Sequence, residues 1–143
     1  MTLLYNKYCE NLTQFEEIAE LVISQIQNGV RVFFVQGKMG SGKTTLIHFI
    51  LKKIGINQLL SSPTYGYLNT YNSPWGDLIH ADLYRIDDID QLFDIGFFEY
   101  VDKNNIMFIE WPNLVEEVDF GTKLYINLYI EFDQRRVELR LII

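Results

Sequence analysis

The residues with the clearest chemical meaning lie in the segment Gly37–Thr44, which fits the pattern G-x-x-x-x-G-K-[ST]. In this pattern a glycine-rich loop wraps phosphate groups, because glycine lets backbone N–H groups approach the phosphate oxygens closely. Three glycines supply that freedom here: Gly37, Gly40 and Gly42. The lysine, Lys43, reaches the β- and γ-phosphates in such a loop, and the Thr44 hydroxyl ligates the Mg²⁺ that bridges them. The segment therefore predicts a nucleotide site.

The sequence on either side of this segment has the strand and the helix that such a loop requires. Val30–Val35 is a β-branched and aromatic run whose length predicts a buried parallel strand. After the loop, apolar residues recur at helical spacing from Leu46 to Ile54, and Gly55 is suited to ending a helix. Amides at the start of that helix would add partial positive charge beside the phosphates.

Hydrolysis of a bound nucleotide also needs a second carboxylate near the metal and an oriented water. Glu110 and Asp82 each follow an apolar run, as acids do at the carboxyl ends of buried strands. Glu110 would bind the metal directly or through a water, and Asp82 would support it or orient the attacking water. Because Glu110 and Asp82 have similar sequence surroundings, the sequence does not show which acid takes which role. For each of them the alternative is a solvated acid at the end of a strand. His80 is more typical of a hydrogen-bonded structural residue than of a catalyst.

Two further helices are expected from local patterns. Thr13–Glu16 resembles a capping box, and apolar residues on one face continue from there to Ile26. A shorter helix is expected from Ile89 to Phe93, begun by Asp87 or Asp88.

The remaining strands complete an α/β arrangement. An alternating stretch at 65–71 predicts a half-buried strand that is broken at 72–74. Leu124–Phe132 and Val137–Leu141 alternate on either side of a turn at Asp133–Gln134 and predict a C-terminal hairpin. We therefore expect an α/β fold of the P-loop NTPase type, with a mainly parallel central sheet and antiparallel strands at one edge.

Composition limits the classes of protein that remain. The 143 residues are 48% hydrophobic, which is enough to bury one core, so we expect a single domain spanning residues 1–143. No apolar run is long enough to cross a bilayer and the N-terminus lacks a signal-peptide layout, which indicates a cytoplasmic protein without membrane contact. Cys9 is the only cysteine and excludes an internal disulfide. A net charge of −7 argues against this chain gripping nucleic acid by itself.

Short motifs after the loop carry a family resemblance. In order, they are Ser62-Pro63-Thr64-Tyr65, His80-Ala81-Asp82-Leu83-Tyr84-Arg85, Gly96-Phe97-Phe98-Glu99-Tyr100 and Ile109-Glu110-Trp111-Pro112. With the loop itself, this series resembles the TsaE (YjeE) family, the bacterial P-loop ATPase of tRNA threonylcarbamoyladenosine (t6A) biosynthesis. The resemblance runs from about Thr13 to the C-terminal hairpin.

The resemblance implies a role for particular residues. Thr44 and Glu110 would hold Mg²⁺, and Asp82 would be needed for hydrolysis together with Lys43. The nucleotide would be contacted by Thr13, Gly37, Met39, Gly40, Ser41, Gly42, Lys43, Thr44, Thr45, Thr64 and Trp111. Three of these have plainer alternatives, namely a helix cap for Thr13, a simple turn for Thr64 and a core aromatic for Trp111.

The resemblance also implies a function. The family's ATPase acts on a complex of the TsaD and TsaB proteins, which forms t6A at position 37 of ANN-decoding tRNAs, so tRNA would be reached only through that complex. ATP and Mg²⁺ would be the cofactors, and activity in isolation would be weak because a partner completes the site.

Two rival functions use the same loop. A small-molecule P-loop kinase is disfavoured because such enzymes usually add clustered arginines, and this chain has five arginines with no cluster in its middle. A non-hydrolysing nucleotide-dependent adaptor would keep Lys43 and Thr44 but dispense with Asp82 and Glu110. The presence of both acids favours the ATPase.

Overall fold

The structure is a computed structural model that describes residues 1–63, 67–103 and 105–143. Its elements follow in chain order: β1 (Thr2–Tyr8), α1 (Leu12–Gln27), β2 (Val32–Gly37), α2 (Lys43–Ile54), β3 (Leu68–Ser73), β4 (Gly76–Asp82), α3 (Ile89–Asp94), α4 (Phe97–Asp102), β5 (Ile106–Glu110), the 3₁₀ helix η1 (Pro112–Val115), β6 (Lys123–Glu131) and β7 (Gln134–Ile142). No helix in these described ranges is both long and apolar enough to cross a membrane.

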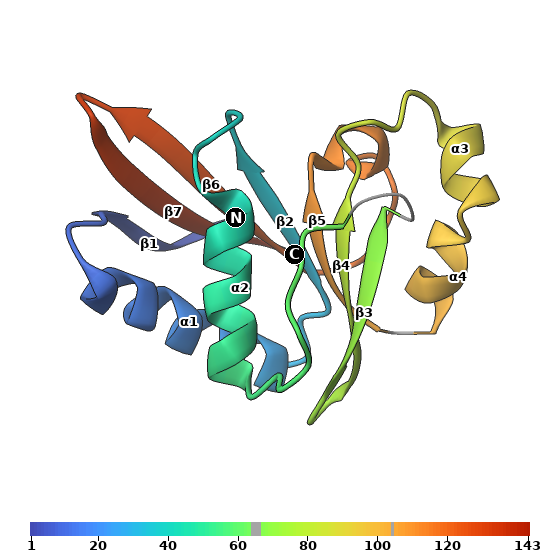
Figure 1. Cartoon of the computed structure of the whole chain (residues 1–143), viewed down its shortest axis with the longest axis horizontal. Helices are drawn as coiled ribbons and strands as arrows, with labels where there is room; N and C mark the ends of the chain where they lie inside the picture. Colours follow the sequence, from blue (N-terminus) through green and yellow to red (C-terminus); the bar gives the residue numbers. More distant parts are fainter. Residues whose placement is uncertain (64–66, 104) are drawn as a thin grey trace.

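The seven strands of the described residues form one twisted sheet in the order β1-β7-β6-β2-β5-β4-β3 (Figure 1). The four central strands, β6, β2, β5 and β4, are parallel to one another. β3 pairs antiparallel with β4 at one edge. At the other edge β7 pairs antiparallel with β6, and β1 pairs antiparallel with β7. The mainly parallel centre is confirmed, but antiparallel strands lie at both edges rather than at one.

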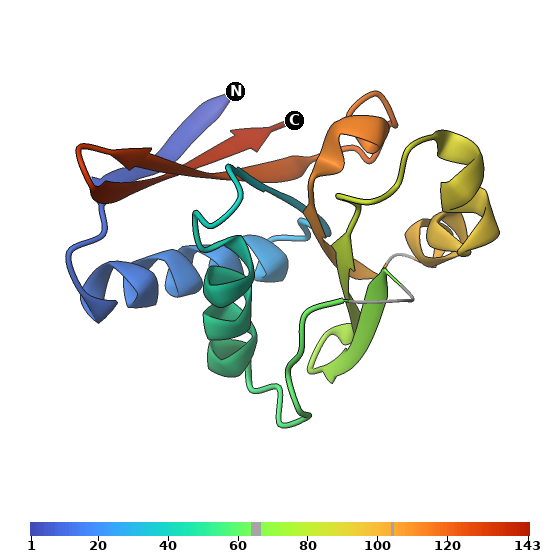
Figure 2. The same ribbon diagram turned by 45° about the horizontal axis from the view of Figure 1, so that its top comes forward.

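Helices cover both faces of the sheet, and the alternation of β2 shows why (Figures 1 and 2). Phe33 and Val35 pack into a core with residues of α1 and α2. Val32 and Phe34 point to the opposite face and pack with residues of α3, α4 and η1. A strand covered on both faces has no solvent side, which explains its uninterrupted apolar sequence.

The cap of the first helix is Asn11, two residues before the predicted cap at Thr13. The Asn11 side chain accepts a hydrogen bond from Thr13 N (2.9 Å), and Gln14 Oε1 accepts one from Asn11 N (3.0 Å). These bonds form a capping box from Asn11 to Gln14. The predicted box at Thr13–Glu16 is therefore wrong, and Thr13 lies in the first turn.

Other boundaries also differ from expectation. Asn72 and Ser73 belong to β3, so the chain does not break at 72 but turns after Ser73 into β4. The predicted start of that strand at 65 lies outside the described residues. The C-terminal hairpin turns at Phe132 and Asp133, both at positive φ, rather than at Asp133–Gln134. For α3 the expectation is confirmed, because Asp88, one of the two expected residues, caps the helix by accepting a hydrogen bond from Gln91 N.

Candidate nucleotide-binding site

The P-loop, residues Gly37–Thr44, connects the end of β2 to the start of α2. A Cβ added at Gly37 would lie 2.5 Å from Ser41 Oγ and 2.9 Å from the backbone oxygen of Leu128 on β6, so only glycine fits there. Gly42 immediately precedes α2 with φ of +98°, a conformation that favours glycine. The close contact at one end and the left-handed residue at the other give the loop its shape.

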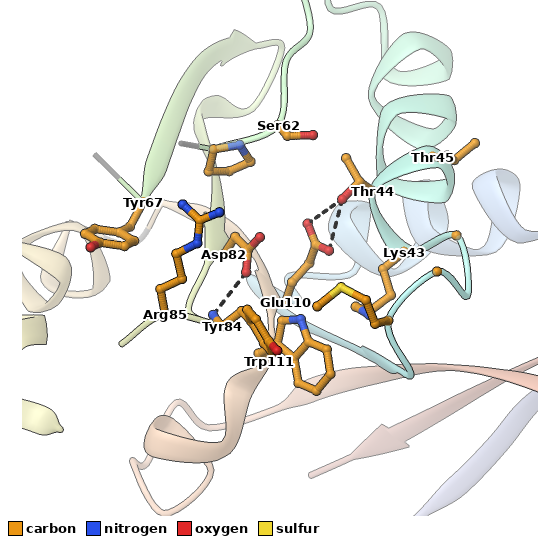
Figure 3. Close-up of a pocket in the computed structure, with 14 residues that line it drawn as sticks. Lys43, Thr44, Thr45, Ser62, Tyr67, Asp82, Tyr84, Arg85, Glu110 and Trp111 are labelled. Atoms are coloured by element: carbon orange, nitrogen blue, oxygen red, sulfur yellow. Dashed lines mark hydrogen bonds between the residues drawn. The ribbon is translucent and has the colours of Figure 1, made fainter. Parts of the chain in front are cut away.

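A cavity of about 450 Å³ opens beside the P-loop, where the carboxyl ends of β4 and β5 meet the start of α2 (Figure 3). Its lining comprises Met39, Gly40, Gly42, Lys43, Thr44, Thr45, Ser62, Pro63, Tyr67, Asp82, Tyr84, Arg85, Glu110 and Trp111. These residues come from separate parts of the chain, and the parallel arrangement of β2, β5 and β4 brings them together. Ligands of open α/β sheets bind at this end of the strands.

Lys43 is a buried cation held at the edge of this cavity. Its Nζ donates hydrogen bonds to the carbonyl oxygens of Gly37 (2.7 Å) and Lys38 (3.1 Å). The same Nζ lies 4.4 Å from the ring centroid of Trp111, a cation–π contact. Burial lowers the pKa of Lys43, while the nearby acids Glu110 and Asp82 raise it and partly offset that effect. The ammonium is thus positioned beside the loop by carbonyls and an aromatic face.

The two strand-end acids are direct neighbours, because β4 and β5 pair Asp82 with Glu110 in parallel register. Glu110 is buried, and both its oxygens lie close to the Thr44 hydroxyl, with Oε1 at 3.1 Å and Oε2 at 3.0 Å. Asp82 Oδ1 accepts a hydrogen bond from Tyr84 N (3.0 Å). The threonine and the two acids therefore meet at one wall of the cavity (Figure 3).

Asp82 lies in an environment that disfavours its charge. Burial is the main cause of a raised pKa, and the negative charge of Glu110 adds to it. The hydrogen bond from Tyr84 N and the positive charge of Lys43 act in the opposite direction. A carboxylate held this way has a stronger attraction for a proton than an exposed one, as a group that takes part in proton transfer needs.

His80 contacts the inner side of the Glu110 carboxylate. Its Nε2 lies 2.6 Å from Glu110 Oε2, and both side chains are almost fully buried. The expectation that His80 is a hydrogen-bonded residue of a strand agrees with this contact, but its partner is one of the two candidate catalytic acids. No local pattern predicted that pairing.

Trp111 adopts the left-handed conformation, with φ of 56° and ψ of 62°, directly after β5. This backbone is uncommon for a large residue and costs of order 1–3 kcal/mol, so surrounding contacts must hold it. The ring packs against Tyr84 with centroids 4.9 Å apart and faces Lys43 on the cavity wall. The plain core-aromatic alternative for Trp111 does not fit this placement.

The cavity does not include every residue that the sequence predicted. Gly37 and Ser41 lie within the P-loop but do not line it, and the buried Ser41 Oγ has no hydrogen-bond partner among the described residues. Thr13 lies exposed in the first turn of α1, away from the cavity lining. Thr64 is outside the described residues.

Arg135 was missed by the sequence reasoning. A Cβ at Gly42 would lie 3.1 Å from Arg135 Cζ, so the guanidinium of this β7 residue packs against the backbone of the P-loop. It adds a permanent positive charge next to a loop that suits anions. The Arg135-Arg136 pair beside the predicted hairpin turn was the only available signal, and it does not indicate a contact with the P-loop.

The donor set fits Mg²⁺. Mg²⁺ takes oxygen ligands, and a P-loop hydroxyl with one carboxylate is a common protein contribution to its coordination. The Thr44 hydroxyl and the Glu110 carboxylate meet these requirements and already lie within hydrogen-bond distance of each other. The described residues contain no separate cluster of three or more His, Cys, Asp or Glu side chains that would hold a metal.

The fold and the site together define an α/β protein of the P-loop class, with a cavity suited to a nucleotide. A family model described as "Threonylcarbamoyl adenosine biosynthesis protein TsaE" matches residues 9–139. The chain belongs to the TsaE family, which confirms the resemblance drawn from its motifs.

Individual relatives agree with this assignment. The chain is 30% identical over 138 residues to the tRNA threonylcarbamoyladenosine biosynthesis protein TsaE of Aquifex aeolicus, with 95% of each chain covered. It is 28% identical over 141 residues to the protein of the same name from Haemophilus influenzae, covering 91% of this chain and 89% of the relative. The crystal structure of Bacillus subtilis YdiB superposes with a TM-score of 0.66 at 22% identity, covering 97% of this chain and 86% of that one. At that identity the structural likeness shows the fold alone.

Proposed function

We propose that this protein binds and hydrolyses Mg·ATP in support of t6A formation on tRNA. One observation carries the proposal: Lys43, Thr44, Asp82 and Glu110, which come from three separate segments, line one cavity beside the P-loop. A P-loop by itself supports binding, whereas a metal-side acid and a second acid are what hydrolysis adds.

The residues divide the work according to their contacts. Backbone N–H groups of Gly40–Thr44 and the start of α2 would bind phosphate oxygens, and Arg135 would add positive charge behind the loop. Lys43 would exchange its hydrogen bonds to the two carbonyls for bonds to phosphate oxygens. Its depressed pKa makes such an exchange favourable, because a phosphate would neutralise a cation that burial penalises.

Thr44 and Glu110 would hold the metal, and bound Mg²⁺ would neutralise charge that develops on the phosphates. Asp82 has one oxygen fixed by Tyr84 N, which leaves the other free to orient a water for attack. Its raised pKa suits it to accept a proton from that water. The Trp111 ring, held between Tyr84 and Lys43, would exclude bulk water from one side.

Family membership supports the biological side of the proposal. The relatives from Aquifex aeolicus and Haemophilus influenzae are named for tRNA threonylcarbamoyladenosine biosynthesis. We propose TsaD and TsaB proteins as the partners, with the tRNA held by them, because this chain carries a net charge of −7. We also propose that the 143 residues act as one domain, since strands from both ends of the chain, β1 and β7, pair within a single sheet.

The direct test is the rate of ATP hydrolysis by the purified protein, alone and with its cognate TsaD and TsaB proteins. We expect weak basal turnover, stimulation by the partners and loss of both in Lys43→Ala. Asp82→Ala and Glu110→Ala should lose turnover while Asp82→Ala keeps nucleotide binding. Unchanged slow turnover in both acid variants would favour a non-hydrolysing adaptor, and the absence of any partner effect would contradict the assignment of partners.

A further inference from the structure

We infer that His80 is a positioning residue for the metal-side carboxylate, holding Glu110 in the orientation that the Mg²⁺ site needs. The inference rests on the proposed function, since it concerns how that site is kept in shape. It begins from a short contact between two buried polar groups, which are uncommon in a core and need a specific partner.

The contact is close and enclosed. His80 Nε2 and Glu110 Oε2 are 2.6 Å apart, and the exposed fractions of the two side chains are 0% and 3%. An ionised carboxylate can only accept, so the proton of this bond lies on Nε2 of the ring. His80 Nδ1 has no hydrogen-bond partner among the described residues, so a neutral ring leaves no N–H unpaired.

The two donors to Glu110 differ in what holds them. The Thr44 hydroxyl has one proton, which lies near both carboxylate oxygens, and its oxygen is also needed as a metal ligand. His80 has no such second role, and it lies on β4, the strand that pairs with β5 in parallel register. Its bond to Oε2 therefore remains available whichever partner Thr44 takes.

A histidine in this position has a specific advantage over a lysine or arginine, because an imidazole can donate a hydrogen bond without carrying a charge. A lysine or arginine at position 80 would neutralise Glu110 and compete with a divalent cation, whereas a neutral imidazole fixes the carboxylate without adding charge. Such contacts to ligand side chains usually change metal affinity by 10- to 100-fold when removed. The expected consequence is a loss of metal-assisted binding, with nucleotide binding in the absence of metal retained.

The test compares two amide substitutions of similar polarity. In His80→Gln the side-chain amide can reach the position of Nε2 and donate to Glu110, whereas in His80→Asn the shorter amide reaches only the position of Nδ1. The readout is the dissociation constant of a fluorescent methylanthraniloyl-ATP in Mg²⁺ and in excess EDTA. We expect the gain in affinity from Mg²⁺ to fall about tenfold in His80→Asn and to be largely kept in His80→Gln.

Controls separate positioning from general damage. His48 lies on α2 with its ring centroid 5.8 Å from that of His80 but does not bond to Glu110, so His48→Gln should keep the full Mg²⁺ gain. In a Glu110→Gln background, His80→Asn should have no further effect, because the two residues act as one unit. Thermal unfolding of each variant reports whether the fold is intact.

Two results would overturn the inference. The first is that Mg²⁺ raises the nucleotide affinity of His80→Asn as much as that of the unsubstituted protein. The second is that His80→Asn still lowers this Mg²⁺-dependent increase in affinity when Glu110 is already replaced by glutamine. If the unsubstituted protein showed no Mg²⁺ gain, the proposed metal site would fail and this inference with it. Failure of the metal site is seen in the unsubstituted protein, whereas failure of the role of His80 is seen only in the variants, so the two can be distinguished.

Discussion

Asp82 and Glu110 lie side by side, yet different contacts hold them. Glu110 is fixed from two sides by His80 and Thr44, whereas Asp82 accepts one backbone hydrogen bond and has its pKa raised by burial. A rigid carboxylate suits a metal ligand, and one with a raised pKa suits proton transfer. The structure thus favours the division in which Glu110 holds the metal and Asp82 acts on water.

The raised pKa of Asp82 predicts a stability change with pH. Below the ordinary aspartate pKa of about 3.8, Asp82 is protonated in both the folded and the unfolded protein, so it does not change the free energy of unfolding. As pH rises through the window above 3.8, the unfolded state loses its proton first, and the folded state becomes relatively less stable. Asp82→Asn removes the cost of a buried charge at this position. The variant should therefore unfold at a higher temperature than the unsubstituted protein at pH 7, and this difference should shrink as the pH falls toward 4.

That prediction is checked by thermal unfolding between pH 4 and 8, in EDTA and without nucleotide. Asp77→Asn is the matched control, because Asp77 lies on the same strand but is exposed. An Asp82→Asn midpoint that is equal to the unsubstituted one at pH 7, or a gain that grows toward acid pH, would contradict the burial argument.

At the scale of elements, local patterns predicted the parts of the fold that surround the chemistry. The P-loop, the helix ended by Gly55 and the strand before Glu110 each follow from a short contiguous signal. β1 was missed because only Tyr5 of that edge strand is buried, which leaves little alternation to detect. Contacts made by Arg135 and His80 depend on strand order and register, and no local spacing encodes these.

The start of α1 provides a prediction about its cap. Asn11→Ala removes the side chain that accepts from Thr13 N and should cost about 1 kcal/mol, lowering the unfolding temperature by a few degrees. Thr13→Ala should cost clearly less, because the Thr13 side chain is not the cap. A Thr13 loss equal to or larger than the Asn11 loss, measured by urea unfolding, would restore the original capping hypothesis.

The close contact of Gly37 in the P-loop with Leu128 of β6 gives a second prediction. Gly37→Ala would place a Cβ 2.9 Å from the Leu128 carbonyl oxygen, a backbone atom that cannot move cheaply, and should destabilise the protein by about 1–3 kcal/mol. The shifted loop should also bind ATP more weakly. Gly121→Ala is the control, since it meets no atom within 4 Å and brings only the strain of its positive φ. Equal losses of stability and an unchanged ATP affinity would argue against the packing explanation.

At the scale of the whole molecule, the parallel centre of the sheet explains why one cavity gathers residues from distant segments. β2, β5 and β4 are adjacent and parallel, so the P-loop, Glu110 and Asp82 emerge at the same end. The antiparallel strands at both edges widen the sheet, and β7 also carries Arg135 to the P-loop.

The overall charge predicts how the protein meets tRNA. With a net charge of −7, the purified protein should bind labelled tRNA with a dissociation constant above about 10 μM at physiological salt. The reason is that phosphate contacts require a local excess of lysine and arginine. Fluorescence anisotropy of the tRNA measures this, first with the protein alone and then with TsaD and TsaB proteins present. Tight binding by the protein alone would contradict the proposal that the partners hold the tRNA.

Calorimetric titration shows whether the cavity beside the P-loop binds Mg·ATP. ATP is titrated into the unsubstituted protein and into Lys43→Ala, each in Mg²⁺ and in excess EDTA. We predict binding by the unsubstituted protein that weakens in EDTA and is largely lost in Lys43→Ala. Binding that is unaffected by the lysine substitution, or no binding to the unsubstituted protein, would contradict a nucleotide site at the P-loop.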